Sequence, residues 1–166
     1  MITSKILTLS LFITIILATN LIVIQLLTRK VKSKYNSEGT LKLAVGLWIS
    51  ILFIVVAIIT SKSANIFYEA YDQITIKPDN LFPVLKVCSI FTGLGITWFI
   101  IWFYVTRVFS LFILGPRNES KEAESNNVAF FILRGSIFLG FMICLNPAFE
   151  TLLRSFLPTV EIPFYH

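Results

Sequence analysis

Four stretches of the chain are almost purely apolar, and each is long enough to cross a lipid bilayer as a helix. They cover residues 6–28, 43–60, 87–105 and 128–145. A helix needs about 20 mainly apolar residues to span the hydrocarbon core. Charged residues lie between these stretches, and only Arg134 lies inside one. The pattern predicts an all-α, polytopic membrane protein with four transmembrane helices.

Composition supports lipid rather than water as the solvent. Hydrophobic residues make up 56% and charged residues 14% of the chain, whereas soluble domains carry about 45–50% and about 25%. The net charge of +5 comes from residues placed between apolar runs. Because nucleic-acid-binding proteins gather their basic residues on one soluble face, we expect no nucleic acid partner.

Basic residues are concentrated in two of the three connections. They are Arg29, Lys30, Lys32, Lys34 and Lys42 in the first connection, and Arg107, Arg117 and Lys121 in the third. Short loops rich in Lys and Arg stay in the cytoplasm. The sequence therefore predicts a multi-pass protein of the inner (plasma) membrane with both termini outside. The polar segment 118–126 is expected to be a solvated, mobile loop.

The spans form two similar hairpins, 1–83 and 84–166. Each pair of spans is followed by an Ala–aromatic–acid segment, Ala64…Phe67…Glu69 and Ala148-Phe149-Glu150. Aromatic residues favour the headgroup zone, so residues 63–71 are expected to form an interfacial segment.

After the fourth span, Asn146-Pro147 can end one helix and start another. An apolar stripe follows at helical spacing, formed by Phe149, Leu152, Leu153 and Phe156. Two interpretations remain open. In one, a short helix lies in the outer interface. In the other, the fourth helix bends and packs this stripe against its neighbours.

The second hairpin carries a short motif. It comprises Asn126-Asn127-Val128-Ala129 and Arg134-Gly135-Ser136-Ile137-Phe138-Leu139-Gly140. It resembles the Asn-x-Ala, Gly-Gly and Leu-Gly pattern of a small bacterial inner-membrane family of tandem two-helix repeats, domain of unknown function 350. Here Ser136 replaces the second glycine. The resemblance implies a bacterial inner membrane location and no catalytic residues.

Arg134 is the sharpest candidate for function, because a charge at mid-bilayer costs about 2.5–3.5 kcal/mol. No Asp or Glu falls inside a predicted span. The side-chain carbonyls of Asn20 and Gln25 are candidate partners. Snorkelling to the cytoplasmic headgroups is the favoured interpretation. The alternatives are a contact within the bundle, with another chain, a lipid phosphate or an anion, and a role in an ion path.

Small residues spaced four apart predict faces for close helix packing. They are Gly46 and Ser50, Ser89 and Gly93, and Ser136 and Gly140. Packing within the bundle is the favoured interpretation, and contact with other subunits is the alternative. Trp98 and Trp102 are expected to pack against a neighbouring helix or an acyl chain, with a lipid or quinone site as the alternative.

The sequence contains few residues that could act in catalysis or bind a metal ion. The two cysteines, Cys88 and Cys144, form no CxxC motif and are expected to be free thiols, and the single histidine is His166. No nucleophile–base set, phosphate loop or metal cluster can be recognised. We therefore expect no enzyme, metal or cofactor, but a structural or accessory subunit of a membrane complex or homo-oligomer. A channel or transport element that uses Arg134, or a quinone- or lipid-binding subunit, is the alternative.

Overall fold

Three long helices dominate the computed structural model, which describes residues 2–32, 42–74 and 81–157. Their bounds are Ile2–Lys32 for α1, Leu43–Ile74 for α2 and Leu81–Leu114 for α3. Each contains an apolar stretch that can cross a membrane, namely Ile6–Arg29, Leu43–Tyr71 and Phe82–Leu114. The shortest has 24 residues and measures about 36 Å, which exceeds the roughly 30 Å hydrocarbon core.

The fourth apolar region is a broken helix. Helix α5 covers Val128–Cys144 and α6 covers Asn146–Arg154, with a bend of 44° between them. Pro147 stands in the first turn of α6, where its missing N–H would have no helical partner in any case. Counted as one span, the pair raises the number of membrane-crossing helices in the described residues from three to four. The prediction of an all-helical protein suited to a membrane is confirmed.

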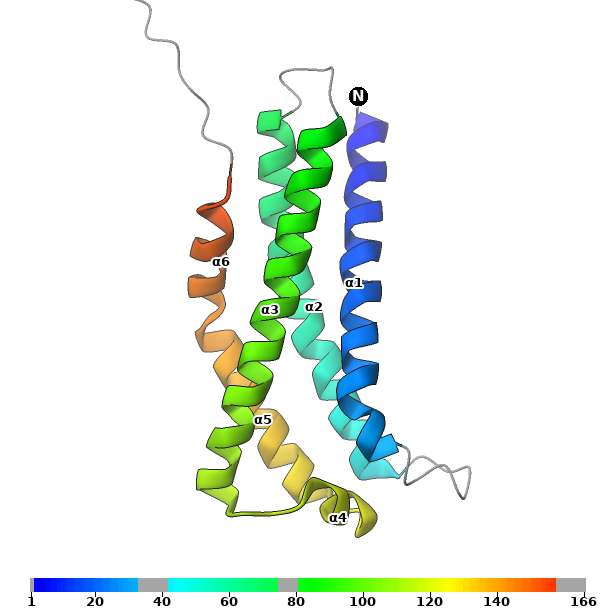
Figure 1. Cartoon of the computed structure of the whole chain (residues 1–166), viewed down its shortest axis with the longest axis vertical. Coiled ribbons are helices and arrows are strands. Elements are labelled where there is room, and N and C mark those ends of the chain that lie inside the picture. The colour runs from blue at the N-terminus through cyan, green and yellow to red at the C-terminus, as the bar shows by residue number, and fades with distance from the viewer. Residues whose placement is uncertain (1, 33–41, 75–80, 158–166) are drawn as a thin grey trace, which may run out of the picture.

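The helices lie side by side and alternate in direction (Figure 1). Helices α1 and α3 descend in this view, whereas α2 and the α5–α6 pair ascend. The short helix α4, Glu119–Glu124, lies at the lower end of the bundle, in the connection that leads from α3 to α5. Helix α2 packs against α1, α3, α5 and α6, so both halves of the sequence share one bundle. The division at residues 83 and 84 stays a prediction, and it falls in the first turn of α3.

Aromatic side chains fill the space between the helices. Phe12 of α1 stacks on Phe67 of α2 with ring centroids 4.2 Å apart. Phe99 of α3 lies 5.9 Å from Phe138 of α5, and all four rings are buried. Apolar side chains on the outside of the bundle are exposed. Phe112, for example, is 84% exposed. Lipid takes the place of water around such a bundle, so an apolar exterior carries no penalty.

Two segments expected to lie outside the helices are helical. Helix α2 continues to Ile74 and buries Phe67 against α1, so residues 63–71 are a continuation of α2, and their position in the interface stays a prediction. Within the polar segment 118–126, α4 buries Ala123 completely. The expectation of a solvated loop was wrong here because local caps and ion pairs hold this segment on the bundle.

The residues after Pro147 match the bent-helix interpretation. Phe149 and Leu153 are buried, and α6 packs against α2 and α3. Phe149 lies 5.3 Å from Trp98 of α3, measured between ring centroids. The apolar stripe of α6 therefore contacts neighbouring helices.

Candidate functional site

The turn before α4 is built to place Glu119. Gly115 ends α3 with a positive φ of +79°, a conformation that suits glycine because it has no Cβ. Asn118 then caps α4, and its side-chain oxygen accepts a 3.0 Å hydrogen bond from the Ser120 N–H. Glu119 is the first residue of the helix, with its side chain only 21% exposed.

Asn126 and Asn127 join α4 to the bundle and start α5. Asn126 reverses the chain with φ +52°, and its side-chain oxygen accepts a 3.0 Å hydrogen bond from the Ala44 N–H at the start of α2. Asn127 caps α5 by accepting from the Phe130 N–H. Its amide also donates to the Glu122 carboxylate at 2.6 Å. The two asparagines of the motif therefore have a structural role.

Arg134 is paired within its own chain. Its side chain is 3% exposed, and Nη1 lies 2.8 Å from Glu119 Oε2. The other oxygen of Glu119 lies 2.9 Å from Arg107 Nε. On its other side, the Arg134 guanidinium lies 4.6 Å from the ring centroid of Trp48, within range of a cation–π contact. A carboxylate bridging two guanidiniums and an aromatic ring together stabilise the buried charge.

Neither Asn20 nor Gln25, the candidate partners on the first span, pairs with Arg134 among the described residues. Asn20 is fully buried, but its amide donates to the carbonyl of Ile16 in its own helix at 2.8 Å. Gln25 is exposed. The partner in the structure, Glu119, lies outside the apolar spans, in the segment expected to be a loop. Its position directly after Asn118, a residue type favoured at helix N-caps, was the available signal.

This cluster is suited to holding helices together. It ties α4 to α3 and α5 through one carboxylate. A small space of about 10 Å³ lies beside Arg107, Arg117 and Arg134, roughly the room of one water molecule. An Arg134 side chain paired on one face and stacked on the other does not line an open path. The structure therefore gives the ion-path interpretation no support.

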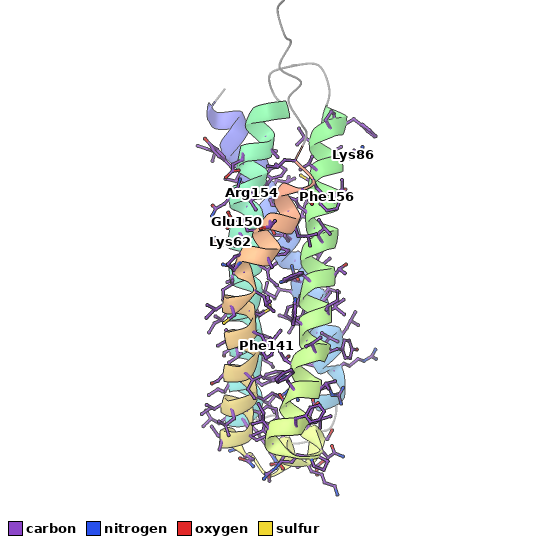
Figure 2. All side chains as sticks on the ribbon, turned by 90° about the vertical axis from the view of Figure 1, so that its left-hand side faces the viewer. Lys62, Lys86, Phe141, Glu150, Arg154 and Phe156 are labelled. Carbon is purple, nitrogen blue, oxygen red and sulfur yellow. The ribbon has the colours of Figure 1, made fainter. Side chains whose placement is uncertain are left out.

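A second charged group lies near the opposite end of the bundle. Glu150 of α6 accepts from Lys62 of α2 at 3.2 Å and pairs with Arg154 at 3.1 Å. Arg154 also forms a two-pronged pair with Glu69 of α2, at 2.6 and 3.0 Å. Figure 2 shows Lys62, Glu150 and Arg154 gathered where α6 crosses α2. The sequence pattern did not indicate that Lys62 and Glu69 of α2 pair with α6.

These charges form one wall of an open cleft between α1, α2 and α6. The cleft has a volume of about 630 Å³, and its other wall carries Leu9 and Ile13 of α1. Its floor is the face of α2 with the small residues Ser61 and Ala64. The cleft exists because small side chains of α2 stand between two flanking helices.

The tryptophans pack inside the bundle. Trp98 and Trp102 meet edge to face with centroids 5.7 Å apart. Trp98 contacts Phe149, and Trp102 stacks 5.9 Å from Phe141. The favoured interpretation, packing against neighbouring helices, matches these contacts. A quinone or lipid at this position stays a prediction.

Most of the predicted small-residue faces point outward. Nothing would meet a Cβ added at Gly93 or Gly140 within 4 Å, and three of the serines are exposed: Ser50, Ser89 and Ser136. Gly46 is half-buried and accepts from the Ser50 hydroxyl through its carbonyl. Packing of these faces inside the bundle was therefore the wrong expectation for Gly93 and Gly140.

The close approach between helices occurs at other glycines. A Cβ at Gly135 of α5 would collide with Cδ1 of Ile51 on α2. At Gly95 of α3, it would lie 3.3 Å from Cγ2 of Ile59. Both glycines are buried. The inward faces of α3 and α5 therefore differ from the faces that carry the predicted small-residue pairs. Each helix turns the face with its large aromatic rings toward the bundle.

Neither a metal centre nor a disulfide is present in the described ranges. Cys88 and Cys144 are free thiols, as expected. Among the residues that the structure describes, no group of three His, Cys, Asp or Glu side chains is placed to hold a metal ion.

Comparison with protein family models, curated proteins and solved structures finds no match. The resemblance to the family of tandem two-helix repeats therefore rests on its motif residues alone. The candidate functions must be argued from the geometry of the bundle.

Proposed function

We propose that this chain is a small integral membrane subunit that packs with copies of itself or with other membrane proteins. The observation that carries the proposal is that Gly93 and Gly140 face outward with open space around them. In lipid, association of helices relies on close backbone approach at small residues. An outward glycine next to an outward serine on the same helix offers such a surface to another chain.

The charged groups support a structural role. Arg134 pairs with Glu119, and Lys62 pairs with Glu150, so each of these charges has an ion-pair partner within the described bundle. The case for association therefore rests on the outward faces rather than on an unpaired arginine. A transport function receives no comparable support from the geometry.

We place the chain in a bacterial inner membrane with both termini outside. The placement is supported by cations at the helix ends that meet near α4, which are Arg29, Lys42, Arg107, Arg117 and Lys121. Under the positive-inside rule these residues face the cytoplasm. The bacterial location follows from the family resemblance alone.

Particle mass in lipid nanodiscs tests the proposed association. A self-associating wild-type chain gives a protein mass that is a multiple of 18.9 kDa, and a heteromeric subunit elutes with a defined partner in mild detergent. Gly93→Leu or Gly140→Leu should reduce that assembly to a single chain. Ala148→Leu places the same leucine side chain at an exposed position outside the pairs and should leave it intact. A wild-type chain recovered alone under both conditions contradicts the proposal.

A further inference from the structure

We propose that the cleft between α1, α2 and α6 binds the headgroup of a zwitterionic phospholipid with a primary amine, of the phosphatidylethanolamine class. This inference is independent of the proposed association. It rests on three properties of the cleft: its depth in the membrane, its balanced charges and its apolar wall.

The cleft lies at headgroup depth. Lys62 of α2 follows Lys42, the residue directly before this helix, by 20 residues. This separation is about 30 Å in a helix, and it equals the thickness of the hydrocarbon core. With Lys42 at one interface, Lys62 reaches the opposite one. The cleft residues Asn65 and Glu69 follow on the next turns of α2, so the cleft opens where phosphate and amine groups of lipids lie.

The charges of the cleft alternate and cancel. Along the wall they run Lys62, Glu150, Arg154, Glu69, each bonded to the next. A net anionic headgroup would meet two carboxylates, and a net cation would meet two basic groups. A headgroup with one phosphate and one ammonium complements both signs.

Several side chains of the cleft have hydrogen-bond donors that can bind the phosphate of the lipid. Lys62 carries three N–H donors and makes one hydrogen bond within the described residues. The side chains of Ser61 and Asn65 make none there, and both line the cleft. These three groups can donate to a phosphate. The lipid ammonium can then donate to the remaining lone pairs of Glu150 and Glu69.

The carboxylates of the same wall also favour a headgroup with a primary ammonium over one with a quaternary ammonium. A primary ammonium donates hydrogen bonds to carboxylates, as the lysine ammonium does. A quaternary ammonium cannot, and it is recognised instead by cages of aromatic rings. Tyr68 is the only aromatic residue lining the described cleft. Leu9 and Ile13 form the opposite wall and receive the upper part of an acyl chain.

Native mass spectrometry of the purified chain with an equimolar mixture of dioleoyl phosphatidylethanolamine, phosphatidylcholine and phosphatidylglycerol tests this proposal. We expect the ethanolamine adduct to exceed the other two by about tenfold, because losing a hydrogen bond to a charged group weakens binding by that order. Equal adducts, or a dominant choline or glycerol adduct, would overturn the proposal.

Matched variants locate the site. Ser61→Leu fills the floor of the cleft and should abolish the preference, whereas Ala57→Leu, one turn away and also exposed, should retain it. Lys62→Gln should lower the ethanolamine adduct, and Lys86→Gln on α3 (Figure 2) should not. Variants are compared only when their thermal unfolding midpoints match the wild type. Retention of the preference in both Ser61→Leu and Lys62→Gln would also overturn the proposal.

Discussion

Arg134 of α5 and Glu119 of α4 form an ion pair of 2.8 Å at the end of the bundle where α3 and α5 are connected. The pair stabilises the bundle only as long as both partners remain, because a single buried charge left behind is costly. We expect Arg134→Met and Glu119→Gln each to lower the free energy of unfolding by about 2–4 kcal/mol. The double variant should cost clearly less than the sum. Thermal unfolding in detergent measures all three, and additive costs would contradict the pairing.

Arg117 provides the control for that cycle. Its side chain is 52% exposed and lies 3.4 Å from Glu122 of the same short helix α4. Exposed charges of this kind contribute about 0–1 kcal/mol. Arg117→Gln should therefore change the unfolding midpoint little.

Replacing Asn20 should have the opposite effect on stability to replacing Arg134 or Glu119. It is fully buried, and its side-chain oxygen finds no partner among the described residues. An unsatisfied buried acceptor costs about 1–3 kcal/mol. Asn20→Leu, which keeps the branched shape and the number of heavy atoms, should therefore leave the bundle as stable as the wild type or about 1 kcal/mol more stable. A lower unfolding midpoint for this variant would show that the oxygen is used in the folded protein.

Two glycines of one helix should respond differently to the same change. Gly135→Ala places a methyl group against Ile51 and should cost about 1–3 kcal/mol, as overpacking does. Gly140→Ala meets nothing within 4 Å, and alanine favours the helix over glycine by about 1 kcal/mol. The unfolding midpoint should fall in the first variant and stay level or rise in the second. Equal shifts would argue against the packing of α2 on α5.

The proposed orientation predicts which end of the bundle is accessible from each side. A reporter that is active only in the cytoplasm, fused after His166, should be inactive, because the basic residues near α4 keep the other end inside. The same reporter inserted at Lys121 of the exposed α4 surface should be active. The reverse pattern would contradict the orientation.

The helices could be predicted from sequence because lipid imposes a simple rule on composition. A spanning helix must be apolar over about 20 residues, and the predicted stretches lie inside the observed helices to within a residue. The helix ends were less predictable. Helix α2 carries Lys62 and Glu69 beyond its apolar run, and pairs with α6 make this continuation stable.

The inward face of each helix was harder to predict than its position. Small residues spaced four apart were taken as the packing faces, but the inner face follows the rings. In α3, Phe91, Gly95, Phe99 and Phe103 recur every four residues and are all buried. This buried stripe includes Gly95, which packs closely against Ile59 of α2. The partner of Arg134 was missed for a different reason, because a loop helix folds back and delivers Glu119 to the end of the bundle.

Disulfide cross-linking in native membranes tests the central claim, association through the outward small-residue faces, most directly. Single cysteines at Gly93 or Gly140, in a chain with Cys88→Ser and Cys144→Ser, should form dimers or adducts with a second protein under mild oxidation. A cysteine at Ala148, exposed but outside these faces, should not. If neither Gly93→Cys nor Gly140→Cys forms adducts above the level of Ala148→Cys, the chain does not associate through these faces.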